Sequence, residues 1–404
     1  MPRAAYLVGG NVRDALLERP AEYLDLDFVL PQDAVKTARA IAQTYRAGFV
    51  LLDADRQIAR VVFDHATVDF AQQVGNSLEE DLRRRDFTVN AIAYNPHTDQ
   101  LVDPLQGYQD LQRKVIRMIA PENLKEDPLR LLRAYRQAAQ LGFTLDPQTE
   151  QMIQQLSPLL SQIAAERIQG ELNYLLNAPK GTLLLTRAWQ DGLFDYWLAH
   201  ATTESLARLG RMDEAAIALD QTWPQLGLHQ AVGTRDPKSH GSTRSWLKVA
   251  KLASLVDPDP SIAESELWRL KYSRIEVQTV LALLRCLSAI QDTDLALLSL
   301  RQQYFFFRNI GSAFPALAIM ALALGVEISV MAPLIDRFLH PEDPVAHPVP
   351  PLTGRDLMQD LQLSPGPQIG QLLEAIQLAQ AEGRVQSRQD AIAFARQQLN
   401  SPNR

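Results

Sequence analysis

The chain has 404 residues, and its 46% hydrophobic and 22% charged content is typical of a folded protein with two or three domains. The net charge of −7 gives no overall basic field, so any nucleic-acid binding must depend on local patches. The single cysteine, Cys286, excludes a disulfide framework within the chain. A strand begins within five residues of the N-terminus, which leaves no room for a signal peptide. The apolar run 316–326 is too short to span a bilayer. We therefore expect a cytoplasmic protein that does not enter a membrane.

The first two predicted strands flank a turn and carry two acids. A short apolar strand leads into Gly9 and Gly10 and then a helix start, a turn at which backbone N–H groups can hold phosphates. The stretch 23–30 alternates apolar residues with Asp25 and Asp27, which is the pattern of a strand. The two acids then share one face, roughly 7 Å apart, and repel each other unless a cation lies between them. Hard oxygen ligands suit Mg²⁺, so this stretch predicts a metal-dependent site for a nucleoside triphosphate.

The remainder of the N-terminal part also mixes helix and strand patterns. The stretch 34–47 has helical apolar spacing, and three further strands are expected at 49–53, 60–63 and 67–70. Asp69 lies on the last of these, where it could reach the same face as Asp25 and Asp27. A single mixed sheet with helices packed against it is the natural architecture.

From about residue 121 the pattern becomes helical, and the whole chain is therefore expected to be α+β. Amphipathic helices are predicted at 124–141, 148–156, 166–176 and 183–197. Beyond 200 the chain stays helical, with a proline-rich linker at 341–351. We expect a catalytic head, a helical neck, a helical body and a helical tail, at residues 1–120, 121–200, 201–340 and 352–404.

Two polar clusters are candidates for binding a nucleotide. Asp86 and Asn90 lie four residues apart, on one face if helical, and both can hydrogen-bond the hydroxyls of a ribose. The arginines just before them can meet phosphates. The alternative for this cluster is a set of charges at a helix N-terminus on a solvated surface.

The second cluster places Asp127 three residues before Arg130, and Arg133 and Arg136 continue the same ridge. An acceptor beside a forked donor complements the Watson–Crick edge of cytosine, and adenine offers a similar pair. Uracil and guanine would set a carbonyl against the carboxylate. The alternative is an ordinary surface ion pair worth under about 1 kcal/mol.

The order and spacing of these motifs are more specific than any one of them. They are Gly9-Gly10-x-Val-Arg13-Asp14, Asp25-x-Asp27, Arg84-Arg85-Asp86-Phe-Thr-x-Asn90-Ala, Asp103-x4-Tyr-x-Asp110-Leu, Glu126-Asp127-x-x-Arg130-x-x-Arg133 and Arg167-Ile-x-x-Glu171-Leu. Taken alone, Arg167 and Glu171 are interpreted as a pair that stabilises their own helix. Over about residues 1–180 the set resembles the bacterial-type (class II) tRNA nucleotidyltransferase and poly(A) polymerase family.

The resemblance implies a role for each motif. Mg²⁺ on the two strand acids would activate the 3′-OH of the RNA for in-line attack at the α-phosphorus, with pyrophosphate as the leaving group. The implied roles are Asp25 and Asp27 as catalytic metal ligands assisted by Asp69; Gly9, Gly10 and Arg13 at the phosphates; Asp86 and Asn90 at the ribose, with Arg85 beside the nucleotide; Asp127 and Arg130 at the base; and Arg133 and Arg136 supporting base or phosphates.

One departure from the family pattern bears on the product. Only 16 residues separate Asp69 from Asp86, whereas members that add the whole CCA end usually carry a longer loop here. The short connection resembles the CC-adding subtype, which leaves the final A to a second family member. We expect CMP addition to the tRNA acceptor end from CTP, with complete CCA synthesis from CTP and ATP still open. The alternatives are a poly(A) polymerase, an A-adding enzyme and, in another class, a non-catalytic tRNA-binding protein.

Overall fold

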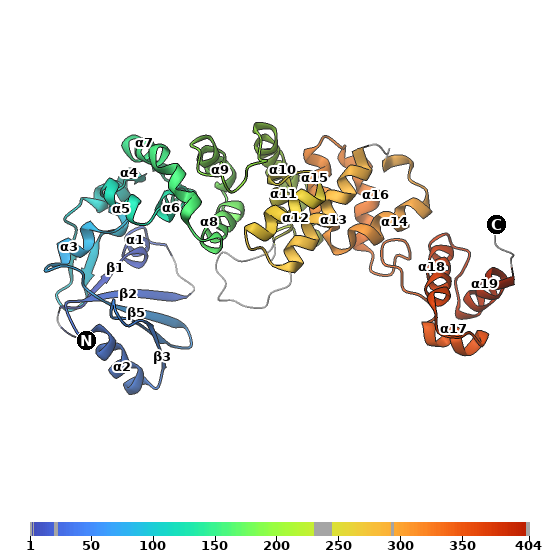
Figure 1. The fold of residues 1–404 in the computed structure, drawn as a ribbon, viewed down its shortest axis with the longest axis horizontal. Helices are drawn as coiled ribbons and strands as arrows, with labels where there is room; N and C mark the ends of the chain where they lie inside the picture. Colours follow the sequence, from blue (N-terminus) through green and yellow to red (C-terminus); the bar gives the residue numbers. More distant parts are fainter. Residues whose placement is uncertain (1, 3, 20–22, 230–244, 292–294, 401–404) are drawn as a thin grey trace. The chain divides into compact units, whose positions relative to one another are not determined.

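The structure is a computed structural model that describes residues 2, 4–19, 23–229, 245–291 and 295–400. The chain divides into two compact units, Met1–Trp197 and Leu198–Arg404. Figure 1 shows that the first unit combines a sheet with helices, whereas the second is built from helices. The expected α+β class, with a mixed sheet followed by helices, is confirmed.

The sheet of the first unit has the strand order β3-β4-β5-β2-β1-β6-β7. β2 and β5 run parallel, and the other neighbouring strands pair antiparallel. The strands predicted at 23–30, 49–53, 60–63 and 67–70 are all present, with bounds that differ by a few residues. The strands are β1 (Tyr6–Val8), β2 (Leu24–Leu30), β3 (Gly48–Asp53), β4 (Ile58–Val62), β5 (Ala66–Gln72), β6 (Ala93–Asn95) and β7 (Gln100–Val102).

The two faces of β2 are used differently. Phe28 and Leu30 join the core beneath α2 (Ala34–Tyr45), whose small buried residues Ala34, Ala38 and Ala42 recur at helical spacing. Val29 points the other way and packs with Leu82 and Ala91. Because strand side chains alternate, Asp25 and Asp27 share the face of Val29 and lie opposite α2. The register therefore turns the acid pair away from the core beneath α2.

The helices of the first unit correct two predicted extents. The helix expected at 124–141 is broken between α5 (Pro121–Glu126) and α6 (Leu129–Leu141), because the residue before Pro128 is disfavoured in helical conformation. The helix expected at 183–197 ends at Gln190, shortly before Gly192 at φ +80°. The remaining elements are α1 (Gly10–Leu16), α3 (Leu78–Arg83), the 3₁₀ helix η1 (Thr88–Asn90), α4 (Gly107–Arg113), α7 (Pro147–Leu156), α8 (Ala165–Asn177), α9 (Gly181–Gln190) and the pair β8 (Val115–Ile116) and β9 (Thr144–Leu145).

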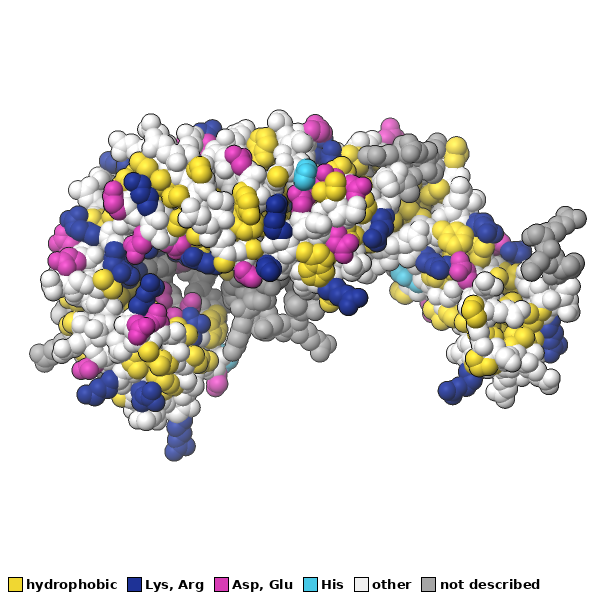
Figure 2. Space-filling view, in the orientation of Figure 1, with side chains coloured by type: hydrophobic (Ala, Val, Ile, Leu, Met, Phe, Trp, Pro, Cys, Tyr) yellow, Lys and Arg dark blue, Asp and Glu magenta, His cyan; other side chains and the backbone are white. Residues whose placement is uncertain are grey.

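The described part of the second unit contains helices and no strand. One helical run, Leu300–Ala323, is long and apolar enough to cross a membrane by length and composition alone, but 61% of its most apolar window is buried inside the fold. Basic and acidic side chains are interspersed over the face shown in Figure 2. The helices are α10 (Thr203–Thr222), α11 (Trp246–Leu255), α12 (Pro260–Arg269), α13 (Arg274–Gln291), α14 (Leu300–Ile310), α15 (Phe314–Ala323), α16 (Ile328–Leu339), α17 (Gly354–Leu361), α18 (Pro367–Ala381) and α19 (Arg388–Asn400).

Candidate active site

The turn between β1 and α1 passes directly beside the acid-bearing strand. Gly9 adopts φ +78°, in the left-handed region that favours glycine. A Cβ atom built on Gly9 would lie 3.4 Å from Oδ2 of Asp27 and 3.6 Å from Nη1 of Arg85. Glycine thus lets the backbone approach both side chains, and the predicted phosphate turn lies at the predicted metal pair.

Three carboxylates gather where β2 and β5 lie side by side. Asp27 is paired with Asp69 in the register of the two strands, and both side chains share one face of the sheet. Burial, and to a lesser extent the negative charges of Asp69 and Asp25, raise the pKa of Asp27 from 3.8 to about 6, against the opposing charges of Arg85 and Arg60. Asp27 therefore lies where burial and neighbouring carboxylates disfavour its ionised form when no cation is bound.

Asp69 is held by a partner of its own. Arg60 on β4 donates to both of its carboxylate oxygens, at 2.7 and 2.8 Å. Within the described residues, no group of three or more His, Cys, Asp or Glu side chains is arranged to hold a metal ion. Of the three carboxylates, Asp69 has a bidentate arginine partner, whereas Asp25 and Asp27 do not.

Asp86 and Asn90 come together without lying on one regular helix. Asp86 precedes η1, and Asn90 closes it. The Nδ2 atom of Asn90 donates to Oδ1 of Asp86 at 2.9 Å and to Oε1 of Gln137 at 3.0 Å, while Arg13 donates to its Oδ1 at 2.8 Å. Gln137 is a buried residue of this hydrogen-bonded cluster, and the sequence motifs did not predict it. A recess of about 290 Å³ is lined by Gly9, Gly10, Arg13, Arg85, Asp86, Asn90, Arg133, Arg136 and Gln137.

A second motif, around Asp103 and Asp110, supports η1 from behind. Thr88 donates to Oδ2 of Asp110 at 2.7 Å, and both side chains are buried. A Cβ atom on Gly107 would lie 2.2 Å from the carbonyl oxygen of Thr88, so only glycine fits at this contact. Asp103 accepts hydrogen bonds from the backbone N–H groups of Gly107 and Tyr108 at the start of α4. This motif fixes the backbone that carries Asn90.

The arginines of α6 bind acids on neighbouring elements. Arg133 lies 3.4 Å from Asp86, and Arg136 lies 2.5 Å from the buried Glu171 of α8. The interpretation of Glu171 and Arg167 as a pair within their own helix is therefore wrong. α8 packs against α6, so Glu171 reaches across to Arg136, and Arg167 reaches to Asp127 at 2.8 Å. Sequence spacing alone could not reveal these partners.

Asp127 and Arg130 are oriented by contacts that an ordinary surface pair would lack. Asp127 lies before α6 and accepts hydrogen bonds from Arg167 and from the backbone N–H of Leu129. Burial by itself would raise the pKa of Asp127, but the hydrogen bond and charge of Arg167 bring it below its usual value. Arg130 donates to the carbonyl oxygens of Asn123 at 2.8 Å and Arg84 at 3.1 Å.

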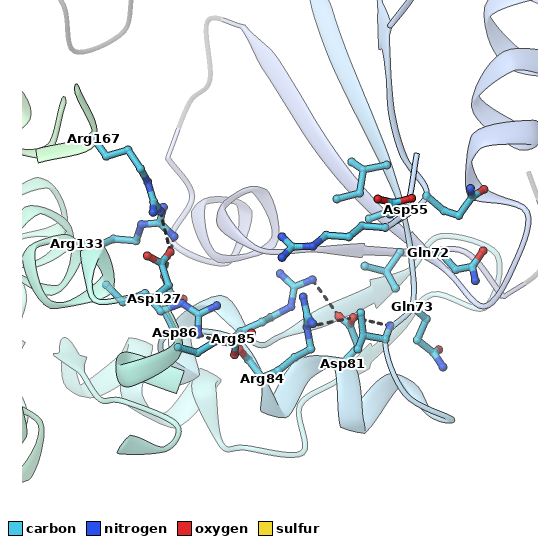
Figure 3. A pocket seen from close by; sticks show the side chains of 18 residues that line it. Asp55, Gln72, Gln73, Asp81, Arg84, Arg85, Asp86, Asp127, Arg133 and Arg167 are labelled. Carbon is cyan, nitrogen blue, oxygen red and sulfur yellow. Dashed lines mark hydrogen bonds and ion pairs between the residues drawn. The ribbon is translucent and has the colours of Figure 1, made fainter. Parts of the chain in front are cut away.

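These side chains line a cavity of about 980 Å³ within the first unit. Figure 3 shows Arg167 and Asp127 on one side of it and Arg84, Arg85 and Asp81 on another. Its lining residues are Val29, Asp55, Arg56, Gln57, Ile58, Ala71, Gln72, Gln73, Val74, Asp81, Arg84, Arg85, Asp86, Glu126, Asp127, Arg130, Arg133 and Arg167. The cavity can hold a polyanion with a base, because arginines and acids face it together.

Comparison with known proteins agrees with this geometry. Residues 5–117 match the model of the poly A polymerase head domain, 142–203 an RNA- and SrmB-binding site of polymerase A, and 238–395 a tRNA nucleotidyltransferase domain 2. A CC-adding tRNA nucleotidyltransferase of Synechocystis is 49% identical over 98% of this chain and 94% of its own length. The chain belongs to the tRNA nucleotidyltransferase family.

Other members of the family differ in product. An A-adding tRNA nucleotidyltransferase of Deinococcus radiodurans is 34% identical over 97% of this chain and 95% of its own length. The crystal structure of the Bacillus stearothermophilus CCA-adding enzyme in complex with CTP superposes with a TM-score of 0.70 at 26% identity, covering 98% of this chain and 93% of that one. The family to which this chain belongs therefore includes enzymes named for different products.

Nucleotidyltransferases of this family generally use a divalent metal. The residues of this chain fit such an ion. Asp25 and Asp27 offer hard oxygen ligands, and burial with the neighbouring carboxylates raises the pKa of Asp27, an effect that a bound cation would offset. The exposed position of Asp25 leaves one side of the pair open to substrate oxygens.

Proposed function

We propose that this tRNA nucleotidyltransferase adds CMP residues from CTP to the tRNA 3′ end without a nucleic-acid template and stops at CC. The observation that carries the chemistry is the meeting of the Gly9 turn, the carboxylates of Asp25 and Asp27, and Arg85 at one place. CC rather than CCA addition is supported by the name of the Synechocystis relative and by the short connection between β5 and α3.

In this proposal Asp25 and Asp27 hold Mg²⁺. When bound, Mg²⁺ neutralises the triphosphate and lowers the pKa of the attacking 3′-OH. Asp69 assists as a neighbouring charge that Arg60 keeps in place. Gly9, Gly10 and Arg13 face the phosphates, and pyrophosphate is released.

The remaining polar residues select the nucleotide. Asp86 and Asn90 hydrogen-bond the ribose, and Arg85 lies beside the nucleotide. Asp127 accepts from the amino group of cytosine while Arg130 donates to its ring acceptors. The roles of Arg133 and Arg136 are to support the base or phosphates from α6, where Asp86 and Glu171 orient them.

The helical parts then hold the RNA. We propose that residues 1–120 form the catalytic head, 121–200 the nucleotide-selecting neck, 201–340 a body that binds the tRNA acceptor end, and 352–404 a tail. The enzyme acts in the cytoplasm, and a second family member completes the A addition. This division of labour is supported by the existence of separately named CC-adding and A-adding relatives.

The experiment is an incorporation assay on tRNA that lacks its CCA end. CTP alone should give two additions, and ATP alone or added afterwards should give none. Absence of CMP addition would overturn the proposal, complete CCA synthesis would overturn its CC-only part, and AMP addition to tRNA ending in CC would favour an A-adding enzyme. Asp25→Ala should abolish transfer and leave RNA binding nearly intact.

A further inference from the structure

Asp81 is a buried carboxylate in the wall of the large cavity that none of the roles above uses. It lies on α3 and is only 4% exposed. Its Oδ2 atom accepts from Nη2 of Arg85 at 3.2 Å, and its Oδ1 atom accepts from the backbone N–H of Val74 at 3.0 Å. Figure 3 shows Arg84 and Arg85 both directed toward it. One carboxylate thus joins a nucleotide-side arginine to the connection between β5 and α3.

That connection, residues 73–77, is tied down along its length. The backbone N–H of Gln73 donates to the carbonyl oxygen of Leu30 at the end of β2 (2.7 Å). The backbone N–H of Asn76 donates to Glu80 (2.8 Å), and the Ser77 hydroxyl accepts from the backbone N–H of Glu80. Together with the bond from Val74 to Asp81, these contacts leave the connection little freedom to change shape.

Gly75 shows how closely the connection fits against α3. Its φ is +82°, and a Cβ atom would lie 2.3 Å from Oε2 of Glu80 and 2.9 Å from Cβ of Glu80. The turn can therefore close onto α3 only with glycine at this position.

Arg85 has a second environment on its far side. Its Nη1 atom lies near Gly9, its charge lowers the pKa of Asp27 against the other influences there, and its buried Nε atom has no hydrogen-bond partner. Asp81 is the carboxylate that binds its Nη2 atom. The orientation of Arg85 toward the phosphate turn therefore depends on Asp81.

We propose that Asp81 is a positioning residue that locks Arg85 and the 73–77 connection into one rigid cavity wall, and that this wall holds the cavity in its CTP-selecting shape at both additions. The inference rests on the proposed CMP-adding function and assigns its fixed specificity to a named contact. If this wall does not change shape between the first and the second addition, the cavity should prefer CTP at both.

The test compares Asp81→Asn and Asp81→Ala with wild type on tRNA lacking CCA, using CTP and ATP separately. Asp81→Asn keeps an oxygen for Val74 and removes the charge that orients Arg85. Because a hydrogen bond to a charged group is stronger than one between neutral groups, its weakening should raise the KM for CTP about ten-fold or more, with kcat within about two-fold. Asp81→Ala frees both Arg85 and Val74 from this contact, so AMP addition, which the wild-type enzyme should not perform, should become measurable.

Two further variants separate this role from a general loss of structure. Glu79→Gln, on the exposed face of the same helix, removes a surface pair with Arg83 and should leave both constants at wild-type values. Gly75→Ala should lower the CTP preference by itself and add little to Asp81→Ala, because both act on the same wall.

If folded Asp81→Asn and Asp81→Ala proteins keep the wild-type KM and the wild-type CTP preference, the inference is overturned. A fall in CMP addition by Asp81→Ala without any AMP addition would overturn it as well, since a purely structural role lowers activity without relaxing the choice of nucleotide. If Asp81→Ala does not fold, Asp81→Asn decides. Wild-type enzyme that adds no CMP would instead refute the proposed function.

Discussion

Replacing Asp27 by asparagine should make the first unit more stable while abolishing transfer. Asp27 lies among three carboxylates, and burial together with Asp69 and Asp25 raises its pKa from 3.8 to about 6. The folded protein therefore binds this proton more tightly than the unfolded chain does. Well above pH 6, the ionised carboxylate opposes folding by up to about 3 kcal/mol when no metal is bound.

The raised pKa of Asp27 determines how stability depends on pH. Because the folded-state pKa is the higher one, stability should increase as pH falls through about 6 toward 4, and decrease as pH rises. An amide also loses hydration when buried, so Asp27→Asn should recover about 1–2 kcal/mol at pH 7.5 in EDTA. In that variant the pH dependence between 4 and 6 should largely disappear.

The measurement is amide hydrogen exchange of β2 and β5, because it reports on the first unit independently of the second. Asp25→Asn is the matched control: its side chain is exposed, so its gain in stability should be smaller. CMP incorporation should be lost in both variants. If the β2 and β5 amides of Asp27→Asn in EDTA at pH 7.5 exchange as fast as those of wild type or faster, then the ionised Asp27 carboxylate does not destabilise the fold, and the reasoning is refuted.

Three further predictions concern the same unit. At limiting Mg²⁺, CMP addition should fall as pH drops from 7 to 5.5, and more Mg²⁺ should move the fall to lower pH, because protons and metal compete for Asp27. Gly107→Ala should raise the KM for CTP by displacing η1, whereas Gly170→Ala, with no atom within 4 Å of the new Cβ, should leave it unchanged and stabilise α8 by about 0.5–1 kcal/mol. Arg136→Met should destabilise the unit by about 3 kcal/mol in urea unfolding, because it leaves the buried Glu171 without its main partner, and adding Glu171→Gln should restore part of the loss.

Local sequence patterns predict five of the seven strands of the head sheet and the grouping of its acids, but not β6 and β7. Alternation of side chains is a local property of a strand, so the pattern of 23–30 already placed Asp25 and Asp27 on one face, and that of 67–70 placed Asp69 opposite Val68 and Phe70. Glycine before a helix start is also local, and Gly9 indeed has a positive φ.

Which side chains meet across elements depends on how the helices and strands pack, and the sequence pattern does not show it. Arg167 and Glu171 have the spacing of a pair on one helix, yet they bind Asp127 and Arg136, because α8 packs against α6. Nothing local distinguishes these alternatives, since both satisfy the same charges.

Buried members of the site were likewise invisible in the sequence. Gln137 reads as one polar position on an amphipathic helix, and Asp81 as one acid in a charged first turn. Their burial depends on packing that the local pattern does not show: Asn90 reaches Gln137 from a distant segment, and the turn at Val74 folds back onto Asp81. Sequence periodicity therefore predicts which side chains share one face of a helix or strand. It does not predict their partners on other elements, because those depend on how the faces pack together.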